Sequence, residues 1–517
     1  MDVGTVDVAV EVSSDVASDV SPDVPEVAVD VEPDPVEDTG PTAAPYPAPG
    51  AWPANTGPGG PARTFTEDEL YINCATIDGG DLDFTDHHNL VTMYDGYLLM
   101  PWAPEWGRGG LTFFDISDPC APTVAGTGFS ETMRETHSLG FSQHAEGRWT
   151  VVNQRSGLLD GGMQFWDVSN PAEPVAVADM NLPGFIYPDA YARVTLSVFW
   201  QAPFVYAASA DNGVHIVDAT DPRNPEFVGQ YIFDPILRAG QVHAVGNLLI
   251  VTAAEGPRTA LLDISDPTDP LLINEFNTVD EFDIPRENYF SNISGGYSFY
   301  ARKEGAGGLF VYDIRDPMNP VKAGQVLSLG NGGYVFVKDG LAFVGESSSA
   351  AIYDVSDLSD ITQVARLDLE GDLDTMTPIG NMAVLSVDDE ANPNEGTALA
   401  PYALEPDSVA PAVNWVYPND GATNLLPTSR IGLTFTEFID AASAWDGSVR
   451  LYRTGEDPAA TRVEGIISTQ ENVVNFWPVD ELEPNTGYTL ELPVGGVSDF
   501  NGNAIETPFT MSFTTGS

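Results

Sequence analysis

The feature that most constrains this chain is a short acidic motif that recurs every 41 to 52 residues. In five copies an apolar run ends in Asp and is followed by a turn segment with two prolines three residues apart. The aligned positions are Asp115, Asp167, Asp218, Asp263, Asp313, Asp354 and, in a degenerate seventh copy, Tyr402. A fixed period of this length indicates one supersecondary unit that is repeated and stacked on its neighbours.

Each repeat has the pattern of four antiparallel strands. Two-residue turn signals precede the acidic motif, as at Asp95-Gly96, Gly246-Asn247, Asp339-Gly340 and Gly380-Asn381. Such turns join antiparallel strands because their positive φ angles match the strand twist. Four strands per repeat is the size of a propeller blade, so we expect an all-β fold with a seven-bladed β-propeller over residues 69–407. The strand-like segment 69–75 precedes the first repeat, and we expect it to complete the seventh blade and close the ring.

The aspartates of the motif have a structural explanation. An Asp side chain can accept hydrogen bonds from the backbone N–H groups of the turn that follows, and proline stops further strand pairing there. The same turn residues accompany each copy, which favours this role for Asp115, Asp167, Asp218, Asp263, Asp313 and Asp354. The alternative is that the carboxylates are ligands, one from each blade.

These segments resemble the LVIVD repeat, and the segment from Val214 to Asp218 is the nearest match. The resemblance implies a β-propeller from a bacterial, exported or surface-associated family without a known enzymatic activity. Two departures concern the blade count: Leu358 stands where the other copies have proline, and the seventh copy is eroded.

Residues 408–517 change to seven short alternating segments bounded by turns, which predicts an Ig-like β-sandwich. We expect its core to include Val473, Phe476, Tyr488 and Leu490. The segment resembles the SbsA-type Ig-like domain of bacterial surface proteins in its Thr-Phe-Thr-Glu strand at 434–437, its Pro-Asn-Thr turn at 484–486 and its terminal Phe-Thr-Thr at 513–515. The resemblance implies a spacer or adhesion module.

The first 68 residues form a third region. Residues 1–62 contain no Lys or Arg and carry twelve acidic residues, with valines and prolines between them. No face of such a segment can be buried well enough to offset its ordering entropy, so we expect a disordered acidic spacer. The alternative is an acidic tail that binds a partner or collects calcium.

Charge excludes one class of partner. The chain has 77 Asp and Glu against 20 Lys and Arg, for a net charge of −57, so nucleic-acid binding is not expected. No apolar run is long enough for a transmembrane helix. The start at Met1 has no secretory signal, yet both resemblances are to envelope proteins. We therefore expect an extracellular or envelope protein whose signal or lipid-attachment segment lies upstream of Met1.

No residue of the chain is predicted to be catalytic, to bind a cofactor or to ligate a metal. Nucleophile-elbow, Walker and His-Glu-x-x-His motifs are absent. His88 and His137 precede two first strands, where a channel site with Asp86 would need further ligands. The segment Asp499 to Asn503 has some ligand types of a calcium loop, but without its glycine and final acid it fits a hairpin turn better, which leaves structural calcium as the weaker alternative.

Two further predictions concern single side chains. Cys74 and Cys120 fall in neighbouring blades of a closed ring, so we expect a disulfide between them, with two free thiols as the alternative. Tryptophans gather in the first three blades, and any that are exposed could stack on sugars: Trp102, Trp106, Trp149, Trp166 and Trp200.

The function that these observations favour is a non-enzymatic surface or secreted binding scaffold. Propeller loops would engage a protein or glycan partner, with the Ig-like module as spacer. Two alternatives remain open. One is a propeller lyase or hydrolase that acts on glycans at the channel mouth, and the other is a structural component of the envelope or S-layer.

Overall fold

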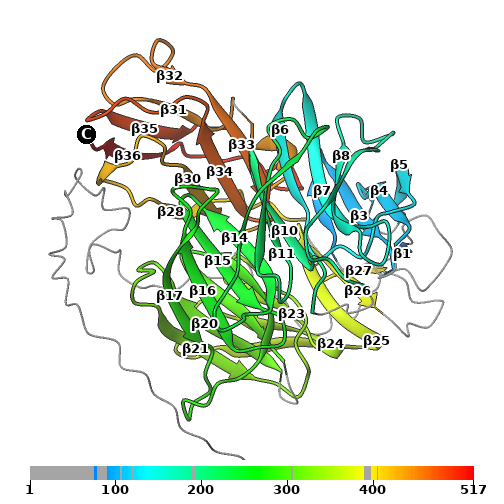
Figure 1. The fold of residues 1–517 in the computed structure, drawn as a ribbon. Coiled ribbons are helices and arrows are strands. Elements are labelled where there is room, and N and C mark those ends of the chain that lie inside the picture. Colours follow the sequence, from blue (N-terminus) through cyan, green and yellow to red (C-terminus); the bar gives the residue numbers. More distant parts are fainter. Residues whose placement is uncertain are drawn as a thin grey trace, which may run out of the picture. The chain divides into compact units, whose positions relative to one another are not determined.

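The structure is a computed structural model. It describes residues 75–77, 90–104, 107–118, 121–187, 192–303, 307–388, 397–403, 406–445 and 447–517 (Figure 1). The acidic spacer predicted within residues 1–68 lies outside these residues.

Five blades have four antiparallel strands that pair in chain order; four of these blades are separate sheets, and the strands of blade 2 belong to an eight-stranded sheet. Blade 1 has β2 (Thr92–Tyr94), β3 (Tyr97–Trp102), β4 (Gly109–Asp115) and β5 (Thr123–Ser130). Blade 2 has β6 (Gly140–His144), β7 (Gly147–Arg155), β8 (Gly161–Asp167) and β9 (Val175–Asn181). Blade 3 has β10 (Ser197–Gln201), β11 (Phe204–Ala208), β12 (Val214–Asp218) and β13 (Glu226–Tyr231). Blade 4 has β14 (Ala239–Val245), β15 (Leu248–Ala253), β16 (Arg258–Asp263) and β17 (Leu271–Asn277). Blade 5 has β18 (Asn288–Ser294), β19 (Tyr297–Arg302), β20 (Gly308–Asp313) and β21 (Val321–Leu327).

Blades 6 and 7 share a long strand, β25 (Thr362–Ile379). Its first part is the outer strand of blade 6, after β22 (Val335–Lys338), β23 (Leu341–Gly345) and β24 (Ser347–Asp354). Its second part is the inner strand of blade 7, followed by β26 (Met382–Asp388) and β27 (Thr397–Pro401).

The ring closes as the sequence predicts. The outer strand of blade 7 is β1 (Ala75–Ile77), which pairs with β27 from the other end of the repeat region. Of the segment 69–75 predicted for this role, Ala75 is described and belongs to β1, and residues 69–74 lie outside the described residues. The described residues therefore contain seven blades, and an apolar cluster with Val91, Ile379 and Leu399 packs blade 7 against blade 1.

The repeat motif has the same local geometry in six blades. The Asp side chain accepts a hydrogen bond from the backbone N–H two residues later, at 2.8–3.1 Å. The strand register also shifts between the two residues that precede this Asp. At each shift one residue of the fourth strand is left without a pairing partner, so the bulge bends the fourth strand after the turn.

Each blade has two ends, which we name by their connections. The turn face carries the connections from first to second and from third to fourth strand, including Gly246-Asn247 and the acidic motifs. The loop face carries the connections from second to third strand and from blade to blade. This division follows because successive strands of a blade are antiparallel.

The C-terminal module is a two-sheet sandwich. One sheet has β28 (Val413–Tyr417), β30 (Ile431–Phe435), β34 (Val473–Pro478) and β33 (Gly465–Gln470). The other has β29 (Ala422–Leu425), β36 (Phe509–Thr515), β35 (Gly487–Leu492), β31 (Arg450–Arg453) and β32 (Arg462–Val463). The short 3-10 helix η1 (Ala441–Ser443) is the one helical element of the described residues. Accordingly, none of the helices seen there could span a bilayer.

The sandwich core contains three of the four residues predicted for it. Phe476, Tyr488 and Leu490 lie between the sheets, whereas Val473 belongs to an apolar cluster formed with blades 3, 4 and 5. Val473 stands at the start of β34, and this end of the module enters the propeller.

Candidate functional site

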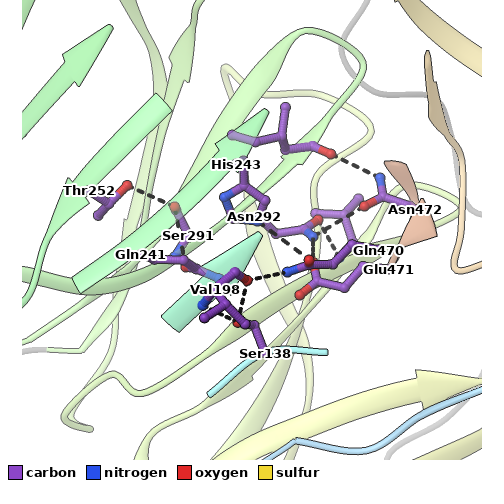
Figure 2. Close-up of polar contacts among 12 residues, drawn as sticks. Ser138, Val198, Gln241, His243, Thr252, Ser291, Asn292, Gln470, Glu471 and Asn472 are labelled. Atoms are coloured by element: carbon purple, nitrogen blue, oxygen red, sulfur yellow. Dashed lines mark hydrogen bonds and ion pairs between the residues drawn. The ribbon is translucent and has the colours of Figure 1, made fainter. Parts of the chain in front are cut away.

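The most extensive polar arrangement joins the Ig-like module to the turn face of the propeller. Strand β33 pairs antiparallel with β6, the inner strand of blade 2, so that one sheet runs from the sandwich into the ring (Figure 1). The tip of the β33–β34 hairpin, Gln470, Glu471 and Asn472, is 5% exposed or less. Figure 2 shows this tip among side chains and backbone groups of several blades.

Gln470 is held by the inner strand of blade 3. Its Nε2 donates to the carbonyl oxygen of Val198 at 3.1 Å, and its Oε1 accepts from the Trp200 N–H at 3.4 Å. The Ser138 hydroxyl donates to the same Val198 carbonyl at 2.6 Å and accepts from the Val198 N–H (Figure 2). Ser138 and Gln470 thus hydrogen-bond to the backbone N–H and carbonyl groups of Val198 in β10.

Glu471 and Asn472 meet blades 4 and 5. Glu471 Oε2 accepts from Asn292 Nδ2 at 2.9 Å and lies 3.8 Å from Nε2 of His243 (Figure 2). Asn472 Nδ2 donates to the carbonyl oxygens of Ile293 and Phe435. Figure 2 also shows Gln241 and Thr252 beside Ser291, whose hydroxyl hydrogen-bonds to that of Thr252 at 2.8 Å. Because these groups are buried, each hydrogen bond that is lost would leave an unpaired polar atom.

The first turns of the other blades also contact the module. In five of these blades the contact is made by hydrogen bonds or an ion pair. In chain order they are Asp95 and Gly96 N–H to Asp440, Ala202 N–H to Ser468, Gly246 N–H to Asn475, Gly295 N–H to Asn414, and Lys338 to Glu437. In blade 7, Gly380 lies so close to Asn501 that a Cβ would be 2.2 Å from its Oδ1. Together with β6 of blade 2, all seven blades touch the module within the described residues.

A buried aromatic stack lies near the loop-face end of the inner strands. Phe290 and Tyr334 stack at 4.0 Å between ring centroids, and His137 stacks on Phe290 at 5.3 Å. His137 Nδ1 is hydrogen-bonded to the Tyr334 hydroxyl, and its Nε2 lies 3.4 Å from Glu135 Oε1. These side chains are 5% exposed or less, so a substrate cannot reach the His–Glu pair unless they move.

Of the histidines predicted to enter the channel, His137 is thus buried within the ring. His88 and Asp86 lie outside the described residues. His144 and His215 donate their Nε2 hydrogens to backbone carbonyls of Ala219 and Pro183. Burial lowers the pKa of His144 and brings the pKa of His215 to about 4.

One group of carboxylates in the described residues is close enough together to hold a metal ion, namely Asp339, Asp407 and Glu437. The ammonium of Lys338 already occupies the space between them, 3.0 Å from Asp339 and 2.5 Å from Asp407. The donor set is therefore that of a buried ion-pair cluster. No sequence pattern predicts this cluster, because its members come from three distant segments.

The remaining sequence predictions concern two cysteines, a turn of the Ig-like module and the tryptophans. Cys74 and Cys120 lie outside the described residues, so their disulfide stays a prediction. Asp499 accepts hydrogen bonds from the backbone and side chain of Asn503, as in a turn. Of the five tryptophans that could stack on sugars if exposed, Trp106 lies outside the described residues, and the other four are 3% exposed or less: Trp102, Trp149, Trp166 and Trp200. Their apolar area packs the blades together.

Comparison with known proteins identifies both domains. A bacterial Ig-like domain family matches residues 407–515, and the LVIVD repeat matches residues 106–127, 198–232 and 258–278. No curated protein matches the chain.

Among solved structures, the computationally designed Ika8 protein has 11% identity, covers 64% of this chain and 99% of its own, and gives a TM-score of 0.42. BamB from Moraxella catarrhalis has 12% identity, covers 63% and 98%, and gives 0.39. The periplasmic gluconolactonase PpgL from Pseudomonas aeruginosa has 11% identity, covers 53% and 87%, and gives 0.42. With the seven blades and the sandwich described above, the family matches establish that the chain carries LVIVD repeats in a β-propeller followed by a bacterial Ig-like domain.

Proposed function

We propose that this protein is a non-enzymatic binding scaffold, secreted or on the bacterial cell surface, that holds a protein partner on the loop face of its propeller. The Ig-like family supports the surface location. The Ig-like module lies against the turn face, so the loop face is the one left for a partner.

The observation that carries this proposal is a set of exposed apolar side chains on loop-face connections. They come from four connections: Leu158, Leu159, Ile232, Ile236, Phe282, Ile284 and Leu329. Phe282 is 73% exposed and Leu329 is 94% exposed. Apolar side chains gathered on one face of a molecule are typical of a protein-binding surface.

Charge narrows the class of partner. Phe282 stands between the exposed carboxylates of Glu281 and Asp283, and Leu159 precedes exposed Asp160. A partner that places apolar groups on Phe282 and Leu159 would meet these acids at the rim, so basic groups around an apolar patch would complement the surface.

The Phe282 connection is also held in shape. Asp280 accepts hydrogen bonds from the N–H groups of Phe282 and Ile284 and pairs with Arg286 Nε at 2.7 Å. A connection ordered before binding loses less conformational entropy on association.

The contacts between the Ig-like module and all seven blades suggest a further role for the module: it stabilises the ring rather than acting only as a spacer.

The test is capture of partners from the native envelope by purified full-length protein. We expect a protein that is retained by the native chain and released by Phe282→Asp or Leu329→Asp. The matched control is Leu271→Asp, since Leu271 is 63% exposed on the outer strand of blade 4. A partner lost equally from all three variants would contradict loop-face binding. Turnover in a glycan hydrolase and lyase screen, abolished by His137→Gln, would instead support the enzyme alternative.

A further inference from the structure

The Ig-like module meets the turn face of the propeller at a set of buried charged groups, which we call the seat. The seat contains more negative charge than positive charge. Lys338 Nζ bonds to carboxylates of Asp339, Asp407 and Glu437, which come from a blade 6 turn, the connecting segment and the module. The side chains of Lys338, Asp407 and Glu437 are 4%, 8% and 2% exposed. With all groups ionised, three carboxylates face one ammonium. Glu437 Oε1 has no hydrogen-bond partner within the part of the chain that the structure describes.

Two further groups face this cluster. Tyr402, at the end of blade 7, donates its hydroxyl to the Gly380 carbonyl and acts electrostatically on Lys338. Asp499, in a turn of the module, interacts with Asp407 and Lys338. The charge of Lys338 acts on Asp339, Glu437 and Asp499 alike, so adding Asp499 increases the excess of negative charge.

Four buried carboxyl groups where the module meets the propeller have a raised pKa. Burial, the largest cause in each case, raises the pKa of Asp339, Glu437 and Asp499. The pKa of Asp440, which accepts from the Asp95 and Gly96 N–H groups on blade 1, is also raised by burial. Burial lowers the pKa of Lys338, but the charges of Tyr402 and the three carboxylates outweigh it and raise that pKa.

Exposed turn carboxylates behave in the opposite way. Hydrogen bonds from Ser117, Thr268 and Ser359 lower the pKa values of Asp115, Asp266 and Asp357. The rise is therefore a property of the seat and not of acidic residues throughout this acidic chain.

We propose that the seat is a pH-sensitive latch, which holds the Ig-like module on the turn face most firmly in acid and less firmly as pH rises. A carboxyl that binds its proton more tightly in the docked state stabilises that state below its ordinary pKa near 4. This stabilisation is lost as pH rises through the higher pKa of the docked form. Lys338 acts in the same direction, because its charge is retained in the seat to a higher pH than in the undocked chain.

The test compares full-length native protein with Glu437→Gln, which removes one titrating carboxyl but keeps a side chain of similar size. The measurement is the thermal unfolding midpoint from pH 5 to pH 9 at fixed ionic strength, with hydrogen–deuterium exchange of residues 465–478 corrected for intrinsic rates. We expect the midpoint of native protein, relative to that of Glu437→Gln, to fall by about 2 °C or more as pH rises across this range. Hairpin exchange in native protein should speed up over the same range relative to Glu437→Gln.

The control is Asp115→Asn, which removes the same charge from an exposed turn and should keep the native pH profile at the hairpin. The difference between two variants in how the unfolding midpoint depends on pH excludes the contributions of His144 and His215, because both histidines are present in every variant. Parallel profiles for native protein and Glu437→Gln would overturn the latch. If Glu437→Gln does not fold, Asp339→Asn provides the same comparison. The measurement does not involve partner binding, so a result against the latch would leave the proposed function unaffected.

Discussion

Asn475 joins the two domains through a single amide side chain. Its Oδ1 accepts from Gly246 N–H at 2.9 Å and Gln201 Nε2 at 3.0 Å, while its Nδ2 donates to the Ala244 carbonyl at 2.8 Å. Asn475→Ala would leave these buried groups without their partner. We expect the free energy of unfolding, measured with urea, to fall by about 2–4 kcal/mol.

The control for Asn475 is an asparagine that bonds within an exposed repeat turn. Asn319 Nδ2 donates to Asp316 Oδ2 at 2.9 Å on the propeller surface. We expect Asn319→Ala to change stability by about 0.5 kcal/mol or less. Equal losses for the two substitutions would contradict the part assigned to Asn475 in docking.

His215 makes acid stability depend on one buried imidazole. It is 1% exposed, and burial lowers its pKa from 6.5 to about 4. The unfolded chain therefore binds a proton more readily, so this residue's contribution is present above pH 6.5 and is lost as pH falls toward 4. We expect the loss of unfolding free energy between pH 7 and pH 5 to be about 2 kcal/mol smaller in His215→Gln than in native protein, measured by urea denaturation at both pH values. Identical losses would show that His215 does not titrate in this way.

At the scale of the element, the sequence predicts blades better than it predicts docking. In the turn pairs, Asp339, Gly340 and Gly380 have the positive φ angles expected of hairpins. By contrast, Gln470-Glu471-Asn472 has the composition of an ordinary solvated turn. The sequence of β34 does contain a sign of docking. Side chains of a strand alternate between its two faces, and Val474 and Phe476 lie in the sandwich core, so Val473 and Asn475 lie on the other face. An outward valine beside an asparagine indicates a partner for that face, although the sequence alone does not say which.

The closing strand β1 allows a test of ring closure. Its pairing with β27 covers an edge that would otherwise expose unpaired backbone groups. We expect a chain that begins at residue 79 to lose on the order of 2 kcal/mol of unfolding free energy and to aggregate as concentration rises. A chain that begins at residue 63 keeps β1 and should match full-length protein. The measurements are urea denaturation and light scattering, and unchanged stability of the shorter chain would argue against closure by β1.

At the scale of the whole molecule, the repeats predict the ring and the sandwich separately, but the contacts between them come from long-range geometry. Asp407, Glu437 and Lys338 are far apart in sequence, and no local period links them. Likewise, Trp415 and Tyr417 of β28 belong to the same apolar cluster as Leu249 of blade 4. Each domain's sequence is compatible with an independent fold, so only the assembled structure shows how much surface they share.

This shared cluster leads to a prediction about cooperativity. When two domains bury apolar side chains against each other, unfolding one exposes the surface of the other and destabilises it. We therefore expect differential scanning calorimetry of the full-length protein to show one transition for propeller and Ig-like module together. Val473→Asp combined with Asn475→Ala places an unpaired charge in the seat and removes its amide contacts, so it should split the transition in two. Leu271→Asp, on the exposed outer strand of blade 4, should leave a single transition. Two transitions in the native protein would mean that the domains unfold independently despite their common core.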